Sequence, residues 1–158
     1  MTVKKILFPL LDSNRGGNIL SALSICKNIN KKKYKAYILL IYDKEKKEKK
    51  NLKLFKNLNI NNINFLTISY NKKKFYSKIV FFYKLICFFS SRSFDIVHTN
   101  DGLLNFSFSI INLLYNFKLV IHLRNTDNSR RNFLTYAIAR KIICISNFVK
   151  IKTLASFS

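Results

Sequence analysis

A short polar loop between an apolar run and an amphipathic segment is the first place where residue types and spacing could do chemistry. In the stretch LFPLLDSNRGGNILSALSICKNI, the apolar run stops at Asp12, and two of the chain's three glycines, Gly16 and Gly17, stand side by side. Free backbone N–H groups at a helix start bind anions, and glycine lets a phosphate approach the main chain without meeting a Cβ. A tight turn alone would also explain the pair. The pattern is not GxGxxG, so it gives little support to a dinucleotide site.

The elements that would position this loop alternate along the chain. Short apolar runs predict strands at residues 3–10, 34–42, 64–70, 94–99, 118–123 and 141–146. Helical spacing predicts helices at residues 17–29, 52–58, 74–90, 103–117 and 132–139, with another beginning at Asn147. Strands joined by helical crossovers form a parallel sheet with helices on both faces. We therefore expect an α/β fold, a single doubly wound, Rossmann-like parallel sheet that binds ligands at the carboxyl ends of its strands.

Composition limits the class of partner. The 158 residues are 49% hydrophobic, enough for one domain with a buried core, and carry a formal net charge of +22. That charge indicates either an anionic partner such as a membrane surface or a compositional bias, because Lys, Asn, Ile and Phe are enriched together. Nucleic acid is not expected, since the aromatic residues lie inside apolar runs. Cys26, Cys87 and Cys144 stand singly, which predicts buried free thiols in a cytoplasmic protein and no metal site.

Four segments together resemble the N-terminal domain of glycosyltransferase family 4, which is one half of a GT-B fold. The stretch at residues 7–29 resembles the family's first strand, Gly-Gly loop and first helix. The segments FDIVHTND, KLVIHLRN and ARKIICISNFVK resemble three later strand ends, in the family's order over essentially the whole chain. The resemblance implies sugar transfer from a nucleotide-sugar donor to a cell-surface glycan or lipid-linked acceptor, with no cofactor besides that co-substrate.

The resemblance also implies a set of site residues. The loop that approaches the donor phosphate or sugar would consist of Asn14, Arg15, Gly16 and Gly17. Candidates that line the cleft are Asp12, His98, Asn100, Asp101, His122, Arg124 and Ser146. His98 could instead be satisfied by neighbouring backbone, and Asp95, which opens the same strand, is expected to cap or pair locally.

This sequence departs from the family pattern at the fifth strand. Arg124 stands where the family commonly has a histidine, and His122 lies two residues earlier. Alternation along a strand puts residues 122 and 124 on one face, so both could point toward the cleft. An arginine there could hold a phosphate or carboxylate with two parallel hydrogen bonds.

The larger departure is length. We expect residues 1–158 to form the N-terminal domain alone, because the family's C-terminal half, with its nucleotide-sugar surface and E-x7-E-type motif, has no counterpart here. Glu45 and Glu48, in the run KEKKEKK, cannot replace it. Transfer requires that the donor diphosphate be held and its leaving charge stabilised. The polypeptide by itself should be inactive or nearly so, as a truncated gene fragment or as a subunit whose C-terminal half is a separate chain.

A second functional reading comes from the segment KKKFYSKIVFFYKLICFFSSR. Its basic residues accompany a broad aromatic and aliphatic face, as in a helix that lies on anionic lipid: Lys72, Lys73, Lys74, Lys78, Lys84 and Arg92. A core helix packed on the sheet would show nearly the same pattern. The alternative function is a non-catalytic basic α/β module on the inner membrane face. The apolar stretch at residues 79–89 is too short for a transmembrane helix and is broken by Lys84.

Overall fold

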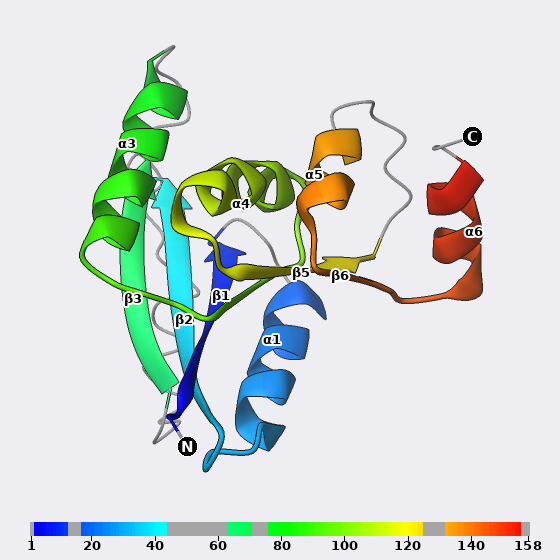
Figure 1. Cartoon of the computed structure of the whole chain (residues 1–158), viewed down its shortest axis with the longest axis horizontal. Helices are drawn as coiled ribbons and strands as arrows, with labels where there is room; N and C mark the ends of the chain where they lie inside the picture. Colours follow the sequence, from blue (N-terminus) through cyan, green and yellow to red (C-terminus); the bar gives the residue numbers. More distant parts are fainter. Residues whose placement is uncertain (1, 13–16, 44–62, 71–75, 125–131, 156–158) are drawn as a thin grey trace. The chain divides into compact units, whose positions relative to one another are not determined.

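The computed structural model describes residues 2–12, 17–43, 63–70, 76–124 and 132–155 (Figure 1). The helix predicted at residues 52–58 lies outside these ranges. The strands are β1 Lys4–Leu11, β2 Tyr34–Asp43, β3 Ile63–Tyr70, β4 Ile96–Thr99, β5 Lys118–Leu123 and β6 Lys141–Cys144. They belong to one sheet in the order β3-β2-β1-β4-β5-β6, with parallel pairing of β1 to β2, β2 to β3, β4 to β5 and β5 to β6. This order confirms the doubly wound α/β prediction.

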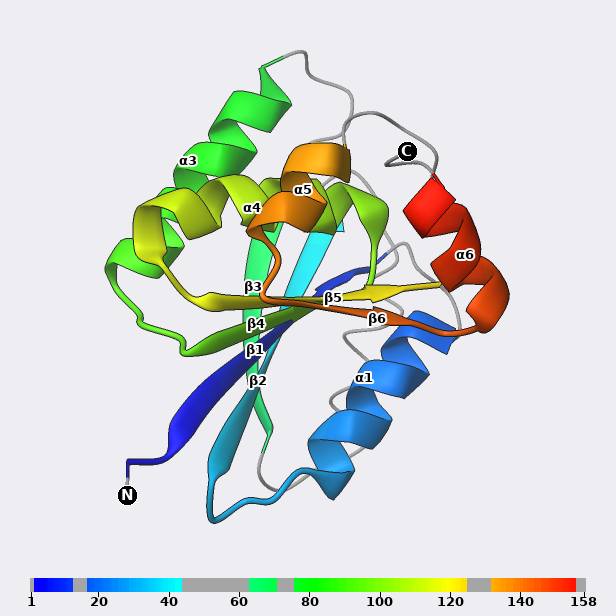
Figure 2. The same ribbon diagram turned by 45° about the vertical axis from the view of Figure 1, so that its right-hand side comes forward.

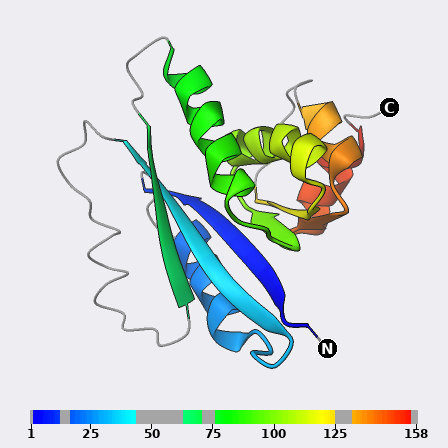
Figure 3. The same cartoon turned by 60° about the vertical axis from the view of Figure 1, so that its left-hand side comes forward.

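The chain divides into two compact units, Met1–Asp95 and Ile96–Ser158. In the first unit the strands are buried on both faces: Ile38, Leu39, Leu40 and Ile41 are all buried although successive side chains point to opposite sides. The helices α1 (Gly17–Asn28) and α3 (Ser77–Ser90) lie on opposite sides of β1, β2 and β3 (Figure 3). Helical spacing puts the buried residues of α1 on one face, and these are Ile19, Ala22, Leu23 and Cys26.

An aromatic cluster joins α3 to the strands of the first unit. The ring of Phe94 stacks on Phe88 at 5.7 Å and meets the ring of Tyr37 edge-on at 5.3 Å. Phe89 packs against both Phe88 and Phe94. The neighbouring Asp95 fixes the end of this segment to β1, because its N–H donates to the Lys5 carbonyl (3.0 Å) and its carboxylate accepts from the Lys5 N–H (2.7 Å). The local pairing expected for Asp95 is thus confirmed.

The second unit holds β4, β5 and β6 with the helices α4 (Gly102–Tyr115), α5 (Asn132–Ile138) and α6 (Asn147–Ala155). Figure 2 shows α4 and α5 on the same side of β5 and β6. Burial along β5 alternates, with Leu119, Ile121 and Leu123 buried and the residues between them more exposed. The buried alternate positions pack under α4, whose Leu104, Phe108 and Ile111 have no exposed surface. The other face of β5 is consequently less covered.

The helix α4 ends without a glycine. Asn116, which follows it, has φ 46° and ψ 45°, and it is the only non-glycine residue with positive φ in the described ranges. Its N–H donates to the Asn112 carbonyl (2.8 Å), and the Asn112 side-chain amide donates to the Phe117 carbonyl. Asparagine tolerates the left-handed region better than other non-glycine residues, which suits a chain with three glycines.

The cysteines differ from one another in exposure. Cys26 is buried in α1, and this burial raises the pKa of its thiol to about 12. Cys144 is half-buried, and Cys87 is exposed, so the expectation of three buried thiols is wrong for Cys87. Cys87 lies one helical turn after the exposed Tyr83, on the outer side of α3. Across the described residues, no helix has the length and apolar character needed to cross a membrane.

Candidate functional site

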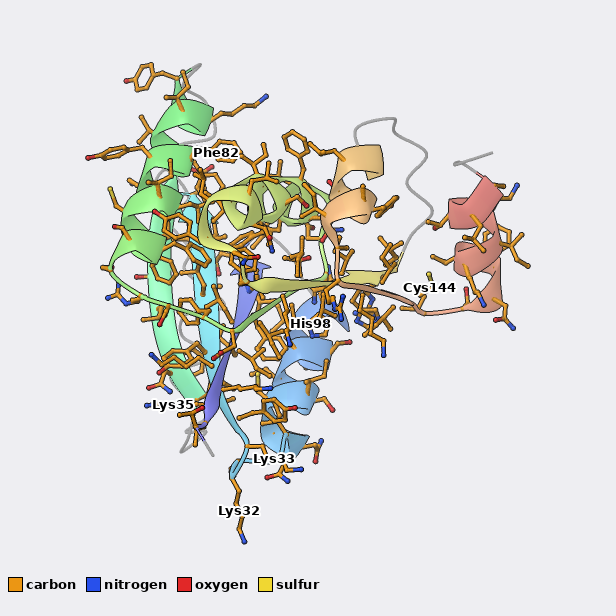
Figure 4. The ribbon with its side chains drawn as sticks, in the orientation of Figure 1. Lys32, Lys33, Lys35, Phe82, His98 and Cys144 are labelled. Atoms are coloured by element: carbon orange, nitrogen blue, oxygen red, sulfur yellow. The ribbon has the colours of Figure 1, made fainter. Side chains whose placement is uncertain are left out.

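Two histidines lie side by side on neighbouring strands of the second unit. His98, on β4, is in register with Val120 on β5, and His122 follows Val120 by two residues, so both imidazoles point to the same face. Their rings stack with centroids 5.9 Å apart and planes 29° from parallel. Figure 4 places His98 on the side of these strands away from α4. The less covered face of the second unit therefore carries the histidine pair.

Both histidines are held in the neutral form. Burial, and to a smaller extent the neighbouring His122, lowers the pKa of His98 from 6.5 to about 4. The pKa of His122 is also lowered, first by burial and then by the positive charge of Arg124. At neutral pH each ring therefore offers one N–H donor and one nitrogen acceptor, and neither adds a positive charge. Such groups suit sugar hydroxyls, which both donate and accept hydrogen bonds.

Arg124 follows β5 directly and is half-buried. The carboxyl ends of parallel strands meet at the same edge, so Arg124 comes to the edge where β4 also ends. A guanidinium in this place is a fixed positive charge next to two neutral imidazoles. Phosphate and carboxylate groups are the ligands that this planar group binds best.

Two other candidates cap helices. The Asp101 carboxylate accepts from the Leu103 N–H (3.1 Å) at the start of α4, and the Asp101 backbone is extended there. The Ser146 hydroxyl accepts from the Val149 N–H (3.2 Å) at the start of α6. Both arrangements satisfy helix N–H groups that have no partner within the helix. Asn100 lies between β4 and Asp101 and is half-buried. All three residues lie just after the carboxyl ends of strands, and Asp101 and Ser146 also cap the helices that follow.

The glycine loop is only partly described. Asp12, just after β1, is half-buried and its N–H donates to the Ile41 carbonyl (2.9 Å). Gly17 is exposed and is the first residue of α1. Asn14, Arg15 and Gly16 lie outside the described residues. The strand therefore ends and the helix begins where the sequence predicts, and anion binding by the loop stays a prediction.

The sequence reasoning missed a cavity at the opposite ends of the strands of the first unit. This cavity has a volume of about 450 Å³ and is lined by Val3, Lys31, Tyr34, Lys35, Ile63 and Asn64. It lies at the amino ends of β2 and β3, whereas a doubly wound sheet predicts ligand sites at the carboxyl ends of its strands. The only signal in the sequence is the run of three lysines at residues 31–33, directly before β2.

Comparison with known proteins defines the class of fold. No protein-family model matches the sequence, and no curated protein is significantly similar to it. Among solved structures, the chain superposes over its full length on a protein assigned as a UDP-N-acetylglucosamine 2-epimerase from Listeria monocytogenes, with a TM-score of 0.70 and 12% identity. The α/β fold is that of one half of GT-B glycosyltransferases and epimerases.

Two further structures contain the same half. HepE of Anabaena in complex with UDP and glucose matches 97% of the chain, with a TM-score of 0.68 and 16% identity. The lipopolysaccharide outer core galactosyltransferase WaaB, in its apo form, matches 98% with a TM-score of 0.64 and 17% identity. The chain spans 43%, 41% and 42% of the lengths of these three proteins, respectively. At such identities the likeness concerns the fold, and membership of glycosyltransferase family 4 stays a prediction.

Proposed function

We propose that this chain is the acceptor-side half of a glycosyltransferase that moves a sugar from a nucleotide-sugar donor to a cell-surface glycan or lipid-linked acceptor. The observation that carries the proposal is the pair of neutral histidines next to Arg124, at the carboxyl ends of β4 and β5. The fold likeness to HepE, which was solved with UDP and glucose, and to the galactosyltransferase WaaB supports it. In doubly wound folds this edge of the sheet is where ligands bind.

Each residue has a distinct part in the proposal. Arg124 binds a phosphoryl group of the donor, because its guanidinium matches two phosphate oxygens at once. His98 and His122 hydrogen-bond to hydroxyl groups of a sugar, and their neutral form avoids repulsion between the two rings. The loop Asn14, Arg15, Gly16 and Gly17 binds a further phosphoryl oxygen through backbone N–H groups.

The proposed chemistry needs a second domain. Retaining or inverting sugar transfer requires the leaving diphosphate to be held from more than one direction while charge develops on it. The neighbours of this chain are more than twice as long as the part that it matches. We propose that a donor-binding domain, in the same or a separate polypeptide, completes the site, and that residues 1–158 alone bind ligand without turning it over.

The substitution Arg124→Gln tests the phosphate contact. We expect it to weaken binding of UDP by about tenfold, the effect of losing one charge-assisted hydrogen-bonded contact, and to leave binding of uridine unchanged. Ligand-detected NMR with the two compounds, titrated against the 158-residue chain, measures both affinities.

Arg140→Gln is the matched control for this experiment. Arg140 is exposed and precedes β6, at the amino ends of the strands of the same unit, so its loss removes the same charge away from the proposed site. We expect R140Q to bind UDP like the parent chain. Equal weakening by R124Q and R140Q, or UDP binding that neither affects, would contradict the role of Arg124.

A second candidate function, contact with an anionic membrane surface, is favoured by the outer face of α3. The exposed fractions there are 73% for Ile79, 40% for Val80 and 66% for Tyr83, and these residues recur at helical spacing. The opposite side buries Leu85, Phe88 and Phe89, so α3 is a core helix with an additional exposed apolar stripe. We define the α3 stripe as Tyr76, Ile79, Val80, Tyr83 and Ile86.

The charges around the stripe are fewer than the sequence suggested. The Lys84 ammonium donates to the carbonyl (2.6 Å) and hydroxyl (3.1 Å) of Ser69 on β3, and the Arg92 guanidinium lies over the Phe88 ring. Lys84 is therefore turned toward β3, against the expectation that it faces lipid, whereas Arg92 is exposed. Lys78 is exposed, and residues 72–74 lie outside the described ranges.

Vesicle flotation tests the membrane function. We expect the parent chain to float with vesicles rich in phosphatidylglycerol, and the double variant Ile79→Ser/Tyr83→Ser to lose most of that recovery, since each lost apolar side chain removes on the order of 1–2 kcal/mol of burial. The variant Ile151→Ser/Leu154→Ser, on the exposed side of α6, is the control. Equal recovery with neutral and anionic vesicles would end this candidate.

A further inference from the structure

The cavity lies at the amino ends of two neighbouring strands of the first unit. β2 begins at Tyr34, and Ala36 on β2 is in register with Ile63 on β3. Tyr34, Lys35, Ile63 and Asn64 of these two strands line the cavity, which has a volume of about 450 Å³. This volume lies within the range of about 300–1,000 Å³ that is usual for small-molecule sites.

Positive charge gathers at this end of the first unit. Lys31 and Lys35 line the cavity, and Lys32 and Lys33 come from the same turn. Figure 4 shows Lys32, Lys33 and Lys35 together at this end of β2. Lys4 and Lys5 come from β1, which is held to the turn because the Lys4 N–H donates to the Lys33 carbonyl (2.9 Å). All six lysines are exposed.

The turn that presents three of these lysines is fixed by one asparagine. The Asn30 side-chain oxygen accepts from the Lys32 N–H (3.0 Å), and the Asn30 carbonyl accepts from the N–H groups of Lys33 (3.0 Å) and Tyr34 (2.9 Å). Because the backbone of this turn is already ordered, little conformational entropy is lost there when a ligand binds. The lysine backbone positions are thus set before any ligand arrives.

Few acidic groups oppose this charge. Among the described residues of the first unit the acids are Asp12, Asp43 and Asp95, and the first two lie at the carboxyl ends of β1 and β2. The carboxylate of Asp95 is hydrogen-bonded to the Lys5 N–H. Six like charges close together repel one another, and a compact ligand with several negative charges would relieve that repulsion.

We propose that this cavity binds a compact ligand with clustered phosphoryl groups. Lys31 and Lys35 contact phosphoryl oxygens as point charges, while the Tyr34 hydroxyl and the Asn64 amide donate further hydrogen bonds. Val3 and Ile63 supply the apolar part of the lining. The site belongs to the first unit, at the amino ends of β2 and β3, whereas His98, His122 and Arg124 belong to the second, and it does not depend on the proposed sugar transfer.

Calorimetric titration with inorganic tripolyphosphate tests the proposal on the 158-residue chain at physiological ionic strength. We expect the double variant Lys31→Gln/Lys35→Gln to weaken binding about tenfold or more, as expected for losing two charged contacts. The matched control Lys150→Gln/Lys152→Gln removes the same charge from the exposed surface of α6 and should change affinity by less than about threefold. If the two double variants weaken binding equally, binding depends only on the overall charge of +22, and the proposal is overturned.

A variant that leaves every charge in place tests the cavity itself. Val3 is 48% exposed at the cavity wall, so Val3→Trp fills the space with little cost to folding. We expect V3W to weaken tripolyphosphate binding as strongly as K31Q/K35Q does, and unchanged binding would overturn the cavity as the site. Vesicles containing phosphatidylinositol bisphosphate form the second arm. If the chain binds these vesicles but not tripolyphosphate, and K31Q/K35Q and V3W both lose vesicle binding, the phosphoryl groups belong to a lipid headgroup. If neither variant weakens binding to tripolyphosphate or to vesicles, the proposal is rejected.

Discussion

Lowering the pH from 7 to 4 is expected to reduce the free energy of unfolding by roughly 3 kcal/mol through His98 alone. Burial holds the pKa of His98 at about 4 in the folded chain, against 6.5 for an unperturbed imidazole. Between these two values the unfolded chain binds a proton that the folded chain does not. The contribution is therefore fully present above pH 6.5 and is lost as the pH falls toward 4. His122, whose pKa is lowered as well, acts in the same direction.

Urea unfolding at a series of pH values measures this effect. About 2 kcal/mol of the loss should occur by pH 5, before most carboxylates titrate. Since the chain has only two histidines, the assignment is direct: His98→Asn should remove most of the slope between pH 6.5 and pH 5. If H98N and the parent chain show the same slope, His98 is not held neutral by its surroundings.

Replacing Phe94 by alanine is expected to cost about 3–5 kcal/mol of folding free energy. Phe94 is 8% exposed, and its ring contacts those of Tyr37, Phe88 and Phe89, which come from β2 and α3. The substitution leaves a cavity between these elements and removes the aromatic pair contacts. A shift of the urea midpoint at constant m-value measures it.

Phe148→Ala is the control for chemical type. Phe148 is 63% exposed on α6, so the same change of side chain should alter stability by less than about 1 kcal/mol. Phe94→Leu, which keeps most of the volume, should lie between the two. A cost for F94A no larger than that for F148A would mean that the aromatic cluster does not hold α3 to the strands.

The order of strands and helices could be read from the sequence because the strands of a buried parallel sheet are continuous apolar runs. YKAYILLIY is such a run, and it forms a strand within one residue of the predicted bounds, while KLVIHL, whose burial alternates, forms a strand at the predicted bounds. The orientation of side chains on α3 could not be predicted in the same way: Lys84, expected to face lipid, bonds to Ser69, and Cys87, expected to be buried, is exposed. A helix that is apolar nearly all round does not reveal which side faces the sheet, so the residues that turn inward could not be chosen in advance.

Less of the candidate site than of the fold could be predicted from the sequence. Alternation along β5 predicts only that residues 122 and 124 share one face, and the register of β5 with β4, which brings His98 beside His122, is known from the structure. The capping roles of Asp101 and Ser146 were not foreseen, because a polar residue after a strand suits a ligand and a helix N-terminus equally well. The lysine-lined cavity lies at the amino ends of β2 and β3, and hydrophobic periodicity predicts strands without showing which side chains surround a cavity at their ends.

The turn after α4 bears on how such a chain can evolve. Asn116 takes the backbone conformation usually reserved for glycine, the Asn112 amide donates to the Phe117 carbonyl in the same turn, and the Asn30 side chain fixes the turn between α1 and β2. With three glycines and one proline in the whole sequence, asparagine supplies much of the chain reversal that those residues provide elsewhere. Replacement of glycine by asparagine at such turns is therefore compatible with this fold, because the asparagine side chain also supplies hydrogen bonds that hold the turn.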